Sequence, residues 1–491
     1  TNSTLELKHV AFRARSWEFI GLVNTNHLGN GSLLSMSSVT ALVDARRWSV
    51  PETADDVAFG PLPSAGFAQG VSFATCDSAF PVDSGSSLVV RNVVVQVRCD
   101  DDCYLRAWTM SSLVNRSSVH IDGLVVNFTV ANATAGAARA FVATPLTFDG
   151  MVRRVDNASV VIRNVLLTIR QDWRGAATTS NFGLLHVLLS SQVRSSSIML
   201  SNITLDVDSS VVAVYTLYFD ALSEGSVLSM FDVRFPSGAC GVCVIDSLTG
   251  ESAVNVSDVT IDNGRGAADC PMQYRSEAAW FVTKLISNHS HFILRNMILR
   301  SNPQATGGIV LVTSSLFSKS SFILRNAIVE ASWWLLSTEA SVGLTLGTVA
   351  NSTVMLEDVR SFGCNPLMIT VAANSAASVL VSGSVFALLP GSSNGDDATL
   401  SARWCVASGG GVVDIRVSGE ASDERHNGDT ILIISGSHFH VPIAFDVEHG
   451  ESLSSLQLHM VECAINTTGS WGGRGGVNST DEDAMAAMDV V

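Results

Sequence analysis

The chain has 491 residues, a formal net charge of −16 at pH 7, and only 15% charged residues, against about 25% in a typical globular protein. Nucleic acids and anionic lipids are bound through basic patches, so this negative balance argues against both as partners. No stretch reaches about 18 uninterrupted apolar residues, so we expect no membrane span within the chain.

The predicted elements begin with two loosely patterned segments, Leu5 to Phe12 and Leu34 to Val39. A Pro-, Gly- and Ser-rich stretch at about 48–85 then reads as an irregular insertion, and Asp55 and Asp56 within it read as solvated turn residues.

A fixed pattern follows: alternating apolar residues, one Asn, Asp or Gly, and alternating apolar residues again, as in Ser159 to Ile169. The turn-like residue recurs at steps of 25 (Asp358 to Gly383) to 41 residues (Gly123 to Asn164), which is typical of a repeat array. Its positions are Asn92, Gly123, Asn164, Asn202, Asp232, Asp258, Asn296, Asn326, Asp358 and Gly383.

Each half of this unit has the period of a β-strand, and the central residue is of a type that adopts a positive φ. A third apolar run, such as Gly308 to Val312, separates one unit from the next. Three strands per coil predict an all-β, right-handed parallel β-helix of roughly 12–14 coils. A β-sandwich is the alternative, although it gives no reason for the bend residue to recur in register.

The inward positions of successive coils should form columns, one of which contains Ile162, Leu200, Leu294, Leu324 and Leu356. Leu324→Asp should therefore cost far more stability than Ser320→Asp, which we expect to be benign.

The predicted β-helix covers residues 1–465. Residues 466–491, with the run Trp471 to Gly476 and several acidic residues, read as a flexible acidic tail. Because the chain begins and ends close to the repeat pattern, we interpret it as a segment of a longer protein whose signal peptide or anchor lies elsewhere.

Twelve N-x-S/T sequons occur, roughly twice the number expected by chance, and they indicate N-glycosylation. Asn127 and Asn255 fall on outward strand positions and should be accessible, whereas Asn202 fills a bend and should be modified poorly. The remaining candidates are Asn115, Asn132, Asn157, Asn288, Asn351 and Asn466.

Nine cysteines, sparse and placed mainly in loops, suit a few disulfides in an oxidising compartment. Cys240 and Cys243 have the spacing of a redox or zinc motif, but no second such pair accompanies them. A local or coil-linking disulfide is the favoured interpretation.

The acidic run Asp100 to Asp102 lies between Cys99 and Cys103 and could bind Ca²⁺, but it reads better as a solvated corner. His438 and His440 share one strand face, which is weak evidence for a metal. We therefore expect no cofactor, no metal site and no catalytic residue.

The repeated unit, exemplified by Ser321 to Val329, together with the Ser, Val and sequon content, resembles the dispersed gene family surface proteins of trypanosomes. The resemblance implies a large cell-surface glycoprotein with an extracellular, pectin-lyase-like β-helical region, adhesive function, and membrane segments that lie outside this chain.

From these observations we expect a non-enzymatic extracellular or cell-surface rod for adhesion or surface coating, with a glycan or an extracellular protein as partner. The alternative is a carbohydrate-active enzyme, either a polysaccharide lyase or a glycoside hydrolase, on the same fold. Two or more outward carboxylates together with Arg or Lys on neighbouring coils would favour the enzyme.

Overall fold

The computed structural model describes most of the repeat region and parts of the segments around it. The regular secondary structure of the described residues consists of β-strands and contains no helix, so the all-β prediction is confirmed. The described ranges are 2–15, 20–23, 27–45, 69–74, 80–99, 103–131, 140–148, 154–172, 182–208, 212–235, 241–264, 281–301, 311–330, 345–363, 365–372, 375–388, 413–418, 429–441, 443–447, 456–465 and 488–490.

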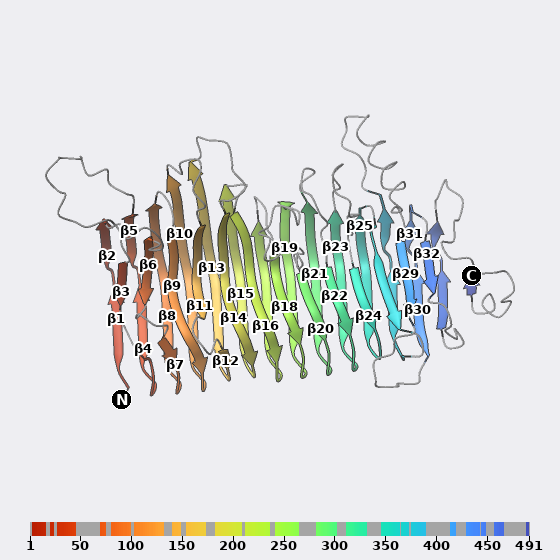
Figure 1. Cartoon of the computed structure of the whole chain (residues 1–491), viewed down its shortest axis with the longest axis horizontal. Coiled ribbons are helices and arrows are strands. Elements are labelled where there is room, and N and C mark those ends of the chain that lie inside the picture. The colour runs from red at the N-terminus through yellow and green to blue at the C-terminus, as the bar shows by residue number, and fades with distance from the viewer. Residues whose placement is uncertain are drawn as a thin grey trace, which may run out of the picture. The chain divides into compact units, whose positions relative to one another are not determined.

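The chain forms two compact units, one of residues 1–191 with 199–218 and the other of residues 192–198 with 219–491. Each unit has two sheets (Figure 1). We call the sheet whose strands carry the bend residue the bent sheet, and the other the opposite sheet. The division between the units falls within β14 (Phe182–Arg194), β15 (Ser197–Asp208) and β16 (Val212–Ser223).

In the first unit the bent sheet contains β1 (Thr4–Lys8), β2 (Ala11–Arg15), β4 (Leu33–Ser37), β5 (Thr40–Ala45), β8 (Ser87–Cys99), β10 (Ser118–Ala131) and β13 (Ser159–Asp172). Its opposite sheet contains β3 (Ile20–Val23), β6 (Gln69–Ala74), β7 (Phe80–Val82), β9 (Cys103–Val114), β11 (Ala140–Phe148) and β12 (Arg154–Asp156).

In the second unit the bent sheet contains β17 (Val227–Phe235), β19 (Ala253–Gly264), β21 (His291–Ser301), β23 (Ser321–Glu330), β25 (Thr353–Phe362), β27 (Ser378–Ser382), β28 (Val385–Ala387), β30 (Thr430–Ser435), β31 (His438–Phe439), β33 (Leu456–Val461), β34 (Ala464–Ile465) and β35 (Met488–Val490). Its opposite sheet contains β18 (Gly241–Leu248), β20 (Phe281–Ile286), β22 (Leu311–Leu316), β24 (Thr345–Val349), β26 (Met368–Ala372), β29 (Val413–Ser418) and β32 (Ile443–Val447).

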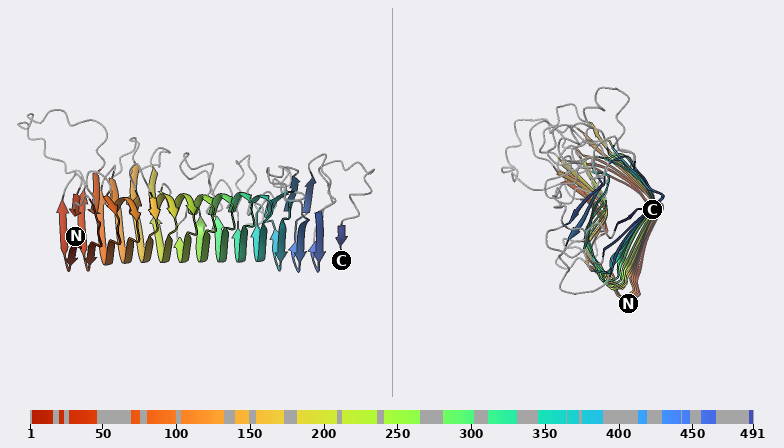
Figure 2. Two further views of the ribbon diagram at one scale, coloured as in Figure 1. Left: turned by 90° about the horizontal axis from the view of Figure 1, so that it is seen from below. Right: turned by 90° about the vertical axis from the view of Figure 1, so that its right-hand side faces the viewer.

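Each strand pairs in parallel with its equivalent in the next coil, as β21 does with β23 and β20 with β22. Figure 2 shows this stacking of successive strands within each unit. Sandwiches are built from antiparallel strands, so the parallel register rules out that alternative. The predicted parallel β-helix, with two strand segments flanking a bend and a third strand opposite, is confirmed.

The bend residues have the predicted left-handed conformation at every predicted position, with φ between 49° at Asn202 and Asn326 and 75° at Gly123. Their side chains also bond to one another along the stack. The Nδ2 group of Asn326 donates to Oδ1 of Asn296 at 2.9 Å, and Nδ2 of Asn296 donates to Oδ1 of Asp258 at 3.0 Å. The bend is therefore held both by local geometry and by its neighbours in adjacent coils.

The core consists of columns of inward side chains. Leu294, Leu324 and Leu356 are register partners in successive strands and are fully buried, as predicted. The other two predicted members, Ile162 and Leu200, are also fully buried and belong to the first unit. Larger side chains stack in the same way: the rings of Phe292 and Phe322 lie 6.0 Å apart and nearly parallel.

Two predicted boundaries differ from the structure. Strands β6 and β7 lie within residues 48–85, where the sequence predicts an irregular insertion, and both pair with β9. Strand β35 lies within the predicted flexible tail and pairs with β33. Both sequence regions are rich in turn-forming residues, which weaken the alternating pattern that predicts a strand. The short strands there depend mainly on pairing with a neighbouring strand, which the local sequence does not show.

Candidate functional site

Five of the twelve sequon asparagines lie at corners between the opposite sheet and the bent sheet: Asn30, Asn115, Asn157, Asn288 and Asn351. At most of these corners two successive residues have a positive φ and a buried serine follows them. The corners of this kind are Asn30–Gly31–Ser32, Ser84–Gly85–Ser86, Asn115–Arg116–Ser117, Glu224–Gly225–Ser226, Gly250–Glu251–Ser252, Asn288–His289–Ser290 and Ser318–Lys319–Ser320.

The corner serines form a hydrogen-bond ladder, which we call the serine ladder. In the second unit the amide of Ser226 donates to Oγ of Ser252, the amide of Ser252 to Oγ of Ser290, and the amide of Ser290 to Oγ of Ser320, each at 3.2 Å. The Ser226 hydroxyl in turn donates to the carbonyl of Ser223 at 2.6 Å and closes its own corner. Each hydroxyl thus satisfies a buried amide of the preceding coil.

Ser252→Ala should lower the free energy of unfolding by about 1 to 2 kcal/mol, because the buried amide of Ser226 loses its acceptor. Ser257→Ala is the matched control, since Ser257 is half-exposed on the outward face of β19, the strand that directly follows Ser252. Urea titration of both variants measures the difference. Equal stabilities would show that the ladder contributes nothing.

The prediction that Ser320→Asp is benign assumed that Ser320 lies at the surface, and this assumption was wrong. Ser320 is only 1% exposed, and its amide donates to Oγ of Ser352 at 3.2 Å. Ser320→Asp would place a carboxylate in that closed ladder. The recurrence of a Ser directly before the bent strands, as at Ser252, Ser290 and Ser320, is the sequence signal that would have identified the ladder.

The corner geometry explains much of the sequon enrichment. Asn is the non-glycine residue best suited to a positive φ, and the ladder requires a serine two positions later. Asn30 and Asn288 therefore head sequons whose serines, Ser32 and Ser290, accept amide hydrogen bonds from the preceding coil, whereas Ser117 of the Asn115 sequon is buried and its hydroxyl has no hydrogen-bond partner among the described residues. The hydroxyl of Ser290, for example, accepts a hydrogen bond inside the protein.

The predicted glycosylation candidates differ in exposure. Asn115, Asn157 and Asn288 have exposed side chains at corners, and Asn351 is partly exposed at another. The strand positions Asn127 and Asn255 are also only partly exposed. The candidates Asn132 and Asn466 lie outside the described residues.

Asn202 has an exposed side chain, but its Nδ2 atom donates to Oδ1 of Asn164 at 2.8 Å. Nδ2 is the atom that would carry a glycan, so a sugar there would replace one N–H of an amide that links two coils. This hydrogen bond is a physical reason to expect poor glycosylation of Asn202.

The other residues considered for chemistry lie apart from this corner. Cys243 is a free thiol, fully buried, and desolvation raises its pKa. Its side chain lies on the buried face of β18. Redox or metal chemistry needs an exposed thiol that ionises readily, and Cys243 is neither exposed nor readily ionised. Cys240 and Asp100 to Asp102 lie outside the described residues.

His438 and His440 are exposed on and beside β31, as the strand pattern predicts. Within the described part of the chain, no group of three or more His, Cys, Asp or Glu side chains is placed to hold a metal ion.

Four outward carboxylates of the bent sheet form ion pairs with arginines of adjacent coils. Asp122 lies 2.7 Å from Arg163, and Glu357 lies 2.7 Å from Arg325. Two further pairs follow the same rule, Arg170 with Asp206 at 2.6 Å and Arg300 with Glu330 at 3.0 Å. Such exposed pairs add little stability, but they occupy acids that general acid-base catalysis would require.

His120, beside Asp122 on β10, is the strongest acid-base candidate among the described residues. Burial between Val89 and Val161 lowers its pKa, and the guanidinium of Arg163 lowers it further, so the imidazole is neutral near pH 7. Both oxygens of Asp122 are already bonded, to Arg163 and to Nδ2 of Asn164 at 2.7 Å each. The pair therefore offers one base and no available acid.

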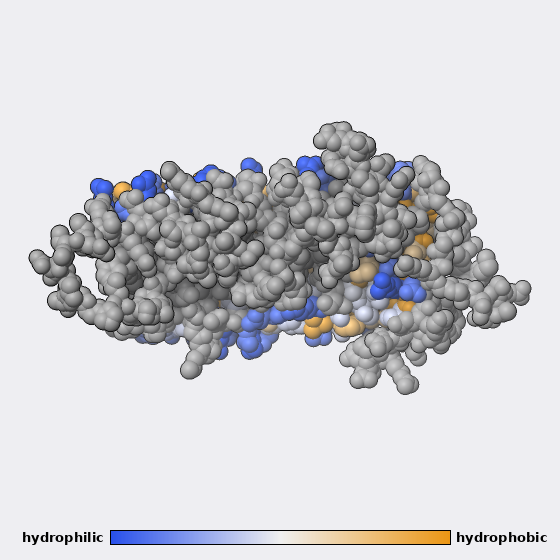
Figure 3. Space-filling model, turned by 45° about the horizontal axis from the view of Figure 1, so that its top comes forward, coloured by the Kyte–Doolittle hydropathy of each residue, from blue (hydrophilic) through white to orange (hydrophobic). Residues whose placement is uncertain are grey.

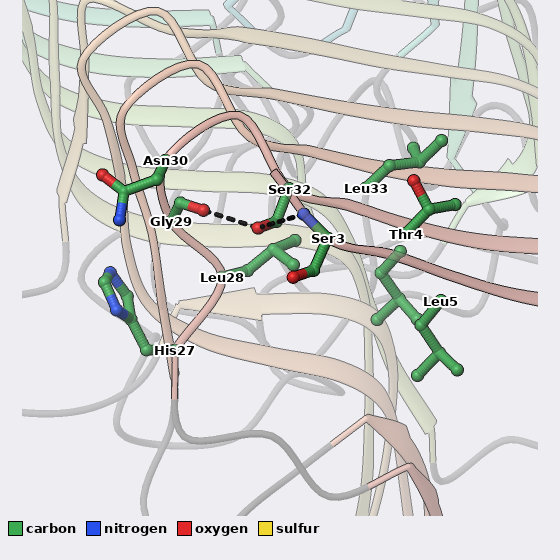
Figure 4. A pocket seen from close by; sticks show the side chains of 10 residues that line it. Ser3, Thr4, Leu5, His27, Leu28, Gly29, Asn30, Ser32 and Leu33 are labelled. Carbon is green, nitrogen blue, oxygen red and sulfur yellow. Dashed lines mark hydrogen bonds between the residues drawn. The ribbon is translucent and has the colours of Figure 1, made fainter. Parts of the chain in front are cut away.

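A pocket of about 360 Å³ lies at the first corner of the first unit (Figure 4). His27 on its rim bonds to Asp83 at 2.9 Å, which lowers the pKa of that carboxyl. The Ser32 hydroxyl donates instead to the carbonyl of Gly29 at 2.6 Å. The Ser32 hydroxyl and the His27 imidazole are not hydrogen-bonded to each other. These two residues therefore do not form the nucleophile and base of a catalytic pair.

Comparison with protein-family models, with curated proteins and with solved structures gave no match. In the described residues no helix is long and apolar enough to cross a membrane.

Proposed function

We propose that this chain is the β-helical part of a non-enzymatic, extracellular surface glycoprotein that acts in adhesion or surface coating. The exposed corner asparagines Asn115, Asn157 and Asn288, each at the head of a sequon, are the observation that carries the proposal. The paired outward carboxylates support it against the enzymatic alternative. A relationship to the dispersed gene family surface proteins of trypanosomes is part of this proposal.

The corner sites lie on neighbouring coils. The amide of Arg116 donates to the carbonyl of Asn157 at 2.6 Å, so Asn115 and Asn157 head adjacent turns of the stack. Glycans on both would project from one corner and shield the same edge. A surface coat benefits from this arrangement, because the sugars on adjacent coils together cover one edge of the stack.

Expression in a glycosylating eukaryotic host should give a secreted protein with glycans at Asn115, Asn157 and Asn288 and none at Asn202. The corner asparagines have exposed side chains, whereas the Asn202 amide links two coils. Peptide mass mapping measures the occupancy.

Asn115→Gly is the control for this mapping, because it removes the acceptor while glycine keeps the positive φ. It should lose one glycan and remain folded. Full occupancy of Asn202, with the three corner sites empty, would contradict the proposed arrangement.

Adhesion is tested by applying the secreted chain to an array of glycans and extracellular matrix proteins. We expect retained binding to at least one class. A chain that binds nothing on the array but cleaves a polysaccharide would support the enzymatic alternative instead.

A further inference from the structure

Two large apolar side chains are exposed on one strand of the second unit, β17. The exposed fraction is 38% for Val227 and 39% for Phe231. Single apolar side chains also lie among hydrophilic ones elsewhere on the described part of the surface (Figure 3), and one alone would need no explanation. No other strand among the described residues exposes two large apolar side chains to this extent.

The two exposed side chains flank a small one. Val227, Ser229 and Phe231 share the outward face of β17, because the alternate residues Leu228 and Met230 are buried in the core. Ser229 itself is half-exposed. The outward face of this strand therefore presents two large apolar groups with a short hydroxyl side chain between them.

A sequon asparagine lies directly beside this serine. Asn255 is the register partner of Ser229 on β19, and Phe231 pairs with Ser257, the hydroxyl residue of the same sequon. The strand spacing of about 4.8 Å and the rise of about 3.3 Å per residue place Val227 and Phe231 about 8 Å from Asn255 along the two diagonals. Both apolar groups are therefore within reach of a sugar on Asn255.

The Asn255 amide is free to carry that sugar. Its side chain is partly exposed, and no hydrogen bond or ion pair engages it among the described residues, whereas Nδ2 of Asn202 is bonded to Asn164. On the side away from β17, the register partner of Ser257 is Arg295, whose guanidinium is exposed and unpaired within the described part of the chain. The surroundings of Asn255 thus combine apolar groups with an available hydrogen-bond donor.

We propose that Asn255 carries an N-linked glycan whose first sugar packs on Phe231 and Val227 and stabilises these two coils. N-acetylglucosamine has C–H groups on the faces of its ring, which would cover the apolar side chains. Its hydroxyl and amide groups lie at the edges, where Arg295 can donate hydrogen bonds. The inference rests on the proposed surface glycoprotein and gives one of its glycans a structural role.

The small size of the apolar patch favours an attached sugar over a separate partner. A stable protein interface covers about 800 Å² on each partner, far more than two side chains provide. Association of a free ligand also costs translational and rotational freedom, which the contacts must offset. A sugar bonded to Asn255 is already held beside Phe231, so a contact with two side chains is enough to keep it in place.

The test uses the full chain secreted from a eukaryotic host that adds high-mannose glycans, trimmed with an endoglycosidase to a single N-acetylglucosamine at each site. Peptide mass mapping should find Asn255 occupied. Hydrogen-exchange mass spectrometry should show amides of β17 and β19 exchanging about fivefold more slowly in the trimmed protein than in Asn255→Gln, since a contact of this kind adds about 1 kcal/mol to the free energy of local opening.

Phe231→Ser should abolish this difference. In that background the trimmed protein and its Asn255→Gln counterpart should exchange at the same rate, and comparing them removes any effect of the serine on the strand itself. Phe231→Tyr keeps the aromatic ring and should retain the full difference.

Asn288→Gly is the matched control for the loss of a glycan. The Asn288 carbonyl accepts from the amide of Glu251, so this sequon heads the coil next to β19, and its neighbours Glu251 and Ser318 are polar. Glycine keeps the positive φ of this corner. The variant should leave exchange in β17 and β19 unchanged. Equal acceleration in Asn288→Gly and Asn255→Gln would mean that sugars protect the coils without a specific contact.

The outcomes separate this inference from the proposed function. An empty Asn255, with glycans present at the corner sites, would overturn the inference and leave the surface glycoprotein intact. So would an occupied Asn255 whose sugar does not slow exchange, or a slowing that persists in Phe231→Ser. Empty sequons throughout the chain would overturn both.

Discussion

Leu324→Asp should lower the free energy of unfolding by several kcal/mol. The side chain lies fully buried between its register partners Leu294 and Leu356, so the substitution removes apolar contacts and places an unpaired carboxylate in a dry column. Urea unfolding monitored by circular dichroism measures the loss, and much of the destabilised protein should be insoluble on expression.

The neighbouring residue provides the control that Ser320 cannot. Ile323 and Leu324 have side chains of the same composition and lie next to each other on β23. Ile323 points outward, whereas Leu324 points into the core. Ile323→Asp should therefore change the stability by less than about 1 kcal/mol. Similar losses in the two variants would mean that the inward and outward faces of this strand are assigned incorrectly.

Asn326→Val should be the second most damaging change, costing about 2 to 3 kcal/mol. Asn326 has a φ of 49°, a conformation that a β-branched side chain adopts only with strain, and the variant also loses the hydrogen bond to Asn296. Differential scanning calorimetry of the purified variant gives the change in Tm and hence the loss.

Asn326→Gly separates the two causes, because glycine tolerates the bend but makes no side-chain bond. Its loss should be no more than about 1 kcal/mol. If the glycine variant were as unstable as the valine variant, the side-chain hydrogen bond to Asn296 would account for most of the loss, and the left-handed backbone would contribute little.

The repeat pattern predicted the bends and the inward columns because each depends on one local rule. A positive φ restricts the residue type at Asn164 or Gly383, and period-two alternation places Leu294 and Leu324 inward without reference to any distant residue. The β-helix follows once such units recur, because coils that each carry an apolar face must stack to bury it.

The serine ladder could not be predicted in the same way. Ser290 and Ser321 are equally polar in the sequence, yet one is fully buried and the other half-exposed. What distinguishes them is the amide of a serine in another coil, a partner 38 residues away for the Ser290 hydroxyl. A prediction based on polarity alone therefore places Ser320 at the surface, although its side chain is buried.

The candidate sites illustrate a related limit. The sequon pattern predicts a glycosylation site at Asn288, but the pattern also arises where a left-handed corner precedes a ladder serine such as Ser290. Phe231 and Asn255 lie 24 positions apart in the sequence, and no local pattern relates them. Only the register of β17 and β19 brings them close together.

Three successive corners from the opposite sheet to the bent sheet have the same length of four residues, 249–252, 287–290 and 317–320, whereas the spacing between bends varies. These three coils therefore enter the bent sheet through junctions of the same length. Unequal recombination between two coils at this junction would insert or delete a whole turn without shifting the register of the rest. Recombination of this kind would change the length of the protein in steps of one coil and keep the parallel pairing of the remaining strands.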